Sequence, residues 1–177
     1  MKVGFLLAKR FAALLIVLVL GIMPLSGCSA FRGGQSADHA NSVTVLPEGV
    51  EKIKVYYRSG LDGFTRNYYV QVELTVADGF LVADESALLE WGLRWGWSIN
   101  DHDLTSVTLQ VFTNPGDPFD WKDEEAFRRL NLDPTRVIYR DFPPPSVGVS
   151  VFRLEPLFGE WPGEVPETPS GLFVRAP

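Results

Sequence analysis

The stretch Tyr68–Ala77, YYVQVELTVA, alternates apolar and other residues along most of its length. Four apolar residues share one parity: Val70, Val72, Leu74 and Val76. A period of two places these side chains on one face of a β-strand. The pattern therefore predicts a strand with one buried face, which needs a second layer of structure to cover it.

The residues before this strand predict its partner. Ile53–Arg58 also alternates and is rich in residues that favour strands. Between the two stretches, Ser59–Gly63 (SGLDG) has the composition of a turn. We therefore expect a β-hairpin. Shorter strands are expected at Val43–Leu46 and Phe80–Val82.

Asp84–Trp97 (DESALLEWGLRWGW) predicts a helix. Asp84 is a good N-cap residue, and an acid in the first turn complements the helix dipole. Apolar residues recur at helical spacing over a wide face, so the helix is expected to pack against the sheet. Gly92 and Gly96 weaken this expectation for the last turns, because glycine disfavours helix interiors.

The second half of the chain predicts further short elements. Strands are expected at Leu104–Thr113, Thr135–Arg140 and Val147–Leu154, and a helix at Trp121–Leu130 with Asp120 as its cap. The predicted fold class is α+β, a single small domain with a mostly antiparallel sheet and one or two packed helices. A β-sandwich is the alternative if the Asp84–Trp97 helix is shorter than expected.

The N-terminal residues have the organisation of an export signal. Met1–Arg10 contains three basic residues and no acid, and the 13 residues Phe11–Met23 are apolar. This apolar run is too short for a typical membrane-spanning helix, which needs about 20 residues. It is followed by Leu25-Ser26-Gly27-Cys28, a large apolar residue and two small residues before the only cysteine of the chain.

On these residues the chain resembles a bacterial lipoprotein precursor. The resemblance implies cleavage between Gly27 and Cys28 and a diacylglyceryl group on the Cys28 thiol, with the new amino group open to acylation. No other cofactor is expected. The implied location is the bacterial cell envelope, with the protein anchored to a membrane by lipid and facing the extracytoplasmic side. Ser29 favours the outer membrane over the cytoplasmic membrane without deciding between them.

The expected organisation has four parts. Residues 1–27 form the signal peptide, and residues 28–42 comprise the lipidated cysteine and a flexible tether of small and polar residues. Residues 43–155 form the α+β domain. Residues 156–177 form a Pro-rich C-terminal tail, which Phe158, Trp161 and Phe173 could hold along the domain.

Composition limits the partners of the mature chain. The whole chain has 16 basic and 22 acidic residues, and three of the basic residues precede Cys28, so 13 remain against 22 and the net charge is −9. This acidity argues against nucleic-acid binding. With Cys28 carrying lipid, no thiol remains for a disulfide or a cysteine-based metal site.

Three groups of residues are candidates for function. Trp91 and Trp95 lie one helical turn apart and could form an aromatic surface for a glycan or a peptide. His102, between two aspartates, could act as a general base. The acids between Asn114 and Glu124 lack the spacing of a calcium loop, so no metal site is predicted.

These observations favour a non-enzymatic interaction or assembly module, held at a membrane and contacting an envelope protein or glycan. One alternative is an extracytoplasmic glycan- or peptide-binding lipoprotein that uses the Trp-rich region. A weaker alternative is a hydrolase that uses His102 with nearby acids.

Overall fold

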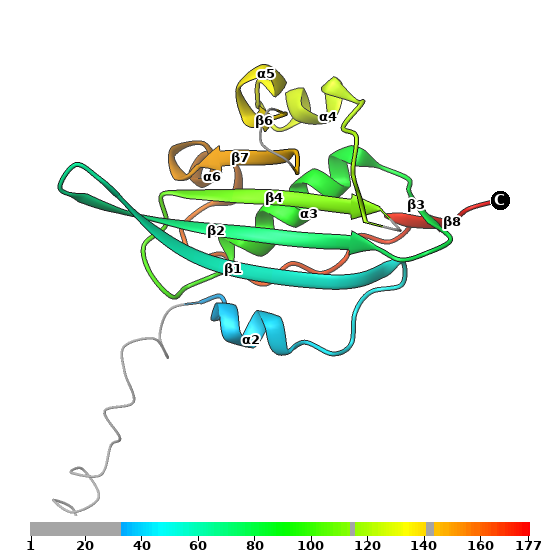
Figure 1. Cartoon of the computed structure of the whole chain (residues 1–177), viewed down its shortest axis with the longest axis horizontal. Coiled ribbons are helices and arrows are strands. Elements are labelled where there is room, and N and C mark those ends of the chain that lie inside the picture. Colours follow the sequence, from blue (N-terminus) through cyan, green and yellow to red (C-terminus); the bar gives the residue numbers. More distant parts are fainter. Residues whose placement is uncertain (1–32, 114–115, 141–143) are drawn as a thin grey trace, which may run out of the picture. The chain divides into compact units, whose positions relative to one another are not determined.

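A six-stranded sheet forms the centre of the fold, with the strand order β1-β2-β4-β7-β6 and β5 paired to β4. The computed structural model describes residues 33–113, 116–140 and 144–177, which belong to one compact unit (Figure 1). The predicted signal peptide and the predicted lipidation site, Gly27 and Cys28, lie outside the described residues. The fold is α+β, a small domain with a mostly antiparallel sheet.

The predicted hairpin is confirmed and is longer than expected. β1 (Val50–Asp62) pairs antiparallel with β2 (Thr65–Val76), from Val50 opposite Val76 to Asp62 opposite Thr65. The turn is therefore the two residues Gly63 and Phe64, and residues 59–62 remain paired. Gly63 adopts a positive φ of 59°, which a two-residue turn of this kind requires and glycine readily allows.

The helix α3 (Glu85–Trp97) connects β2 to β4 (Ser106–Thr113) and covers one face of the sheet. As predicted, Asp84 is its N-cap, and the carboxylate accepts hydrogen bonds from Ser86 N at 2.8 Å and Ala87 N at 3.0 Å. This helical connection places β4 parallel to β2, whereas the other paired strands of the described residues are antiparallel. The buried valines and leucines of β2 and β4 pack under α3.

The C-terminal half differs from the predicted elements. Its observed elements are β5 (Asp117–Pro118), α4 (Glu124–Arg129), α5 (Pro134–Val137), β6 (Ile138–Tyr139), β7 (Ser146–Ser150), α6 (Val151–Phe158) and β8 (Phe173–Arg175). The cap of α4 is Asp123, so the expectation for Asp120 was wrong.

Two predicted strands are partly helical. Within Thr135–Arg140, Asp133 caps a helical turn that begins at Pro134, and proline is well suited to the first helical position. Only Ile138 and Tyr139 are extended. Within Val147–Leu154 the strand ends at Ser150, and the chain continues as α6, whose Leu154 is fully buried.

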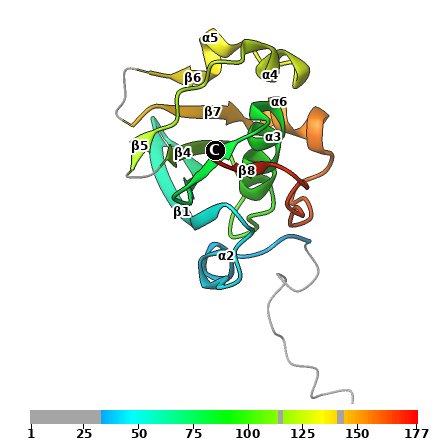
Figure 2. The ribbon, with the colours of Figure 1, turned by 90° about the vertical axis from the view of Figure 1, so that its right-hand side faces the viewer.

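The C-terminal segment packs along the domain. The indole N–H of Trp161 donates to Ile99 O at 3.1 Å, and Leu172 is buried. β8 then pairs antiparallel with β3 (Phe80–Val82), so the two form a separate small sheet. Figure 2 shows α3, α6 and the C-terminal segment on one side of the main sheet.

The part of the predicted tether that the structure describes is folded. Gln35 forms a bridge with Ile99, and the helix α2 (Ala37–Ser42) buries Ala37 and Ala40. The expectation of a flexible tether up to Ser42 was therefore wrong for these residues, because α2 has its own small apolar face. Val43–Leu46, expected as a strand, is irregular.

Asn41, the fifth residue of α2, pairs with the free edge of the sheet. Its side-chain Nδ2 donates to Val55 O and its Oδ1 accepts from Val55 N, both at 2.8 Å. The amide thus replaces a neighbouring strand at the central part of β1. Exposed strand edges are sites of unwanted pairing, and this contact covers one.

Replacing Asn41 with alanine is expected to lower the free energy of unfolding by about 1–2 kcal/mol. The substitution removes both hydrogen bonds between the Asn41 side chain and the backbone of Val55. Urea unfolding of the mature chain measures the change. His39→Ala, on an exposed position of the same helix, is the control and should change stability by less than about 0.5 kcal/mol. Equal effects of the two substitutions would contradict this role for Asn41.

Candidate functional site

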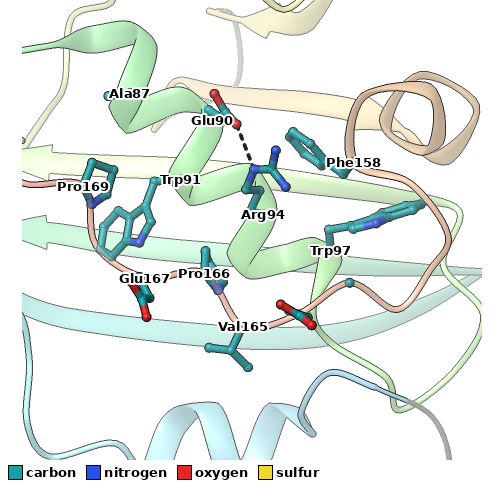
Figure 3. Close-up of a pocket in the computed structure, with 12 residues that line it drawn as sticks. Ala87, Glu90, Trp91, Arg94, Trp97, Phe158, Val165, Pro166, Glu167 and Pro169 are labelled. Carbon is teal, nitrogen blue, oxygen red and sulfur yellow. Dashed lines mark hydrogen bonds and ion pairs between the residues drawn. The ribbon is translucent and has the colours of Figure 1, made fainter.

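A groove of about 760 Å³ lies between α3 and the C-terminal segment of the described residues (Figure 3). This volume lies in the range of small-molecule sites. One wall consists of α3 residues: Ala87, Glu90, Trp91, Arg94 and Trp97. The other wall is Phe158 together with residues between Gly163 and Pro169.

The helical repeat explains the first wall. Ala87, Glu90, Trp91 and Arg94 recur at spacings of three and four residues, so they lie along one face of α3. A different face, which includes Gly92 and Gly96, lies against the sheet. The groove face therefore contains charged and aromatic residues, while the sheet face is apolar and close-packed.

The second wall owes its shape to proline and glycine. Pro166 and Pro169 have fixed φ angles, which limits the conformations of this extended segment. At Gly163 the chain passes so near Trp97 that an added Cβ would lie 2.7 Å from Trp97 Cδ1. Gly163 N also donates to Trp97 O at 3.2 Å. These contacts hold the wall against the end of α3.

Acidic side chains outnumber basic ones among the residues that line the groove. Arg94 Nε lies 2.8 Å from Glu90 Oε1, and the Arg94 guanidinium lies 4.4 Å from the centre of the Phe158 ring. Arg94 is thus held by a carboxylate and by an aromatic face. Glu164 and Glu167 also line the groove, and neither forms an ion pair within the described residues. The rim is therefore acidic.

The two tryptophans predicted to bind a ligand are buried. Trp91 is 2% exposed and Trp95 is 7% exposed, and their rings contact edge to face with centroids 6.3 Å apart. They cannot present an open aromatic surface. Trp91 lies at the base of the groove, whereas Trp95 is not among the lining residues. Their spacing was a sign of core packing, which is the commoner role of apolar residues at helical spacing.

His102 lies in an aromatic cluster with Tyr57 and Tyr68 and does not line the groove. Its ring stacks on Tyr68 at 4.9 Å and on Tyr57 at 5.2 Å between centroids. Burial raises the pKa of Tyr57 well above its usual range, and the nearby Tyr68, Asp101 and Asp103 raise it further. Asp101 accepts a hydrogen bond from Ala37 N at 2.7 Å, so it holds the start of α2. Both Asp101 and His102 thus have structural roles here.

The acids considered for calcium also have other contacts. Asp123 caps α4, and Asp120 lies 3.9 Å from Lys122 Nζ. Among the described residues, no group of three histidine, cysteine or acidic side chains could hold a metal ion. Asn114 lies outside the described residues. Nor does any helix in the described ranges have the length and apolar character needed to cross a membrane.

Sequence reasoning missed most of the groove. Glu90 and Arg94 could have been found, because an acid and a base four residues apart on a helix are a recognisable pair. Phe158, Glu164 and Glu167 had no comparable signal, since the segment that holds them lacks periodicity. Their approach to α3 depends on tertiary contacts.

The chain matches no protein-family model, no curated protein and no solved structure.

Proposed function

We propose that this chain is a bacterial cell-envelope lipoprotein, and that its domain is a non-enzymatic interaction module. The anchor is the diacylglyceryl group on Cys28, and the groove between α3 and the C-terminal segment holds the partner. The observation that carries the binding role is the groove itself: an apolar base, a wall stiffened by proline and an acidic rim.

The anchor rests on the N-terminal sequence. A basic leader, a short apolar run and two small residues before a cysteine occur together in the order that a lipoprotein signal requires. A lipid anchor would keep the domain at the extracytoplasmic surface of the outer or the cytoplasmic membrane. In that position an interaction module can bind a partner without catalytic residues.

The groove favours a peptide segment of an envelope protein over a glycan. Trp91 and Trp95 are too deeply buried for a sugar to stack on them. An extended segment with an apolar side chain would contact the half-buried Phe158, because Trp91 and Trp97 are only 2% and 1% exposed. A basic side chain on the same segment would be attracted by Glu164 and Glu167. Because the proline-containing wall is stiff, little ordering is needed on binding.

Site-specific photocrosslinking in cells tests this proposal. Val165 lines the groove and is 42% exposed, whereas Val174 lies on β8 and is 44% exposed. A photoreactive residue at position 165 is expected to crosslink one discrete envelope protein through a segment with a basic residue. The same residue at position 174 is the control and should give several-fold less product. Equal products at both positions would refute the groove as the binding site.

Removing charge from the groove provides a second test of the proposal. The double substitution Glu164→Gln and Glu167→Gln should reduce the crosslink at position 165 several-fold. Glu155→Gln with Glu160→Gln removes the same charge from exposed positions outside the groove lining and should leave the crosslink unchanged. If both pairs act alike, net charge rather than the groove determines binding.

A further inference from the structure

The tip of the β1–β2 hairpin presents apolar side chains to solvent. Phe64, the second turn residue, is fully exposed, and Leu61 is 72% exposed. β4 pairs with β2 only from Tyr69 onward, so residues 59–68 form a two-stranded projection without a third strand. Figure 1 shows the hairpin extending beyond the neighbouring strands. Four paired positions at about 3.3 Å each give a projection of roughly 13 Å.

The hairpin has a charge opposite to that of the rest of the mature chain. Residues 54–69 contain three basic side chains, Lys54, Arg58 and Arg66, and one acid, Asp62. Arg66 lies directly opposite Leu61 in the pairing, so an apolar and a basic residue are neighbours at the tip. An exposed aromatic residue beside basic residues is typical of segments that enter the interface of an anionic bilayer.

The part of the chain that the structure describes begins at the same end of the domain as this tip. Asn100 Nδ2 donates to Gly33 O at 2.9 Å, and Gln35 bridges Ile99. Two residues further, His102 stacks on Tyr57 and Tyr68 at the base of the projection. In Figure 1 the hairpin tip and the start of the described chain both lie toward the left.

The short stretch of chain between Cys28 and Gly33 favours a bilayer as the partner of the hairpin tip. Cys28 precedes Gly33 by five residues, which can span at most about 18 Å when fully extended. A lipid on Cys28 would therefore keep this end of the domain next to the membrane surface. Any exposed apolar group at this end would meet lipid at high effective concentration.

We propose that the β1–β2 hairpin tip is a second membrane contact, in which Phe64 and Leu61 enter the interface and Arg58 and Arg66 attract anionic lipid headgroups. The proposal rests on the lipid anchor of the proposed function. It sets the orientation of the domain: the hairpin end faces the bilayer, and the groove wall remains open to a partner.

A fluorophore at the tip tests the contact in the lipoprotein itself. Phe64→Cys is labelled with a polarity-sensitive dye, and the protein is reconstituted in vesicles of phosphatidylglycerol and phosphatidylcholine. The emission is expected to shift to the blue and to be quenched several-fold more by brominated acyl chains than at the control position. That control is Asp78→Cys, an exposed residue after the far end of β2, roughly 40 Å from the tip.

Equal quenching at positions 64 and 78 would overturn the proposal. So would a blue shift at position 64 that requires an added envelope protein and occurs without vesicles, because the tip would then contact protein. Arg58→Gln with Arg66→Gln should reduce the quenching at position 64, and vesicles of phosphatidylcholine alone should do the same. Unchanged quenching in both cases would remove the anionic headgroups from the proposal.

Failure of the anchor gives a different result. Wild-type protein has no free thiol if Cys28 is lipidated, so dye uptake by the wild type would refute the anchor alone. In that event the mature chain with Cys28→Ser is added to vesicles from solution, with the dye at position 64 or 78. A selective shift at position 64 would still support the membrane contact, and no shift would overturn it.

Discussion

Cells that express the Cys28→Ala variant are expected to contain no lipid-labelled form of the protein and to lose it from the membrane fraction. The thiol of Cys28 is the only one in the chain, so no other cysteine can accept the diacylglyceryl group. Each buried methylene contributes roughly 0.8 kcal/mol, and two acyl chains give a stable attachment where one does not. Removing both chains should therefore change the distribution from almost entirely membrane-bound to largely released.

Metabolic labelling with a fatty-acid analogue, followed by fractionation, measures both effects. Ser29→Ala changes the next residue conservatively and should leave labelling intact. Lipid incorporation that persists in Cys28→Ala would refute the anchor. Because the hairpin tip is proposed as a weaker contact, a small membrane-associated fraction that depends on Phe64 is compatible with loss of the anchor.

The elements that were predicted well carry a strong local signal. The β1–β2 hairpin alternates along most of β2 and along the central part of β1, and it has a glycine at its turn. α3 has a capping aspartate that binds two backbone N–H groups and an apolar face over its whole length. In both cases the local preference agrees with the tertiary environment, so sequence alone was sufficient.

The elements that were predicted wrongly are short and depend on their surroundings. Val147–Leu154 alternates well enough for a strand, yet Val151 N donates to Thr105 O and the chain then turns into α6 to bury Leu154. Short apolar stretches fit a strand or a helix equally, and tertiary packing decides between them. The folding of residues 33–42 likewise depends on Ile99 and Val55, which are distant in sequence.

The groove could be predicted only in part for the same reason. The candidate aromatic surface was wrong, because Trp91 and Trp95 are buried and do not form an open face. Half of the groove comes from a segment about 70 residues later in the chain. Without a periodic pattern in that segment, sequence could not show which of its side chains would face α3.

Gly96 of α3 allows the helix to pack closely against β4, although glycine disfavours helix interiors. On propensity alone, Gly96→Ala should stabilise the domain by about 1 kcal/mol. In the structure, a Cβ at this position would overlap Val107 Cγ1 and lie 3.2 Å from Val107 Cβ. Val107 is fully buried on β4 and is stiff at χ1, so it cannot move aside cheaply. Glycine is therefore what allows the helix to approach the sheet.

We therefore expect Gly96→Ala to lower the free energy of unfolding by about 2 kcal/mol, the usual cost of overpacking a core. For a domain of this size the midpoint of thermal unfolding should fall by roughly 4–8 °C. Val107→Ala should cost less stability in the Gly96→Ala background than in the wild-type chain, because it removes the methyl groups that the new Cβ overlaps. A double-mutant cycle measures this coupling, which should be at least about 1 kcal/mol. A rise in the unfolding midpoint for Gly96→Ala would show that propensity dominates and that α3 does not rest on β4 through this glycine.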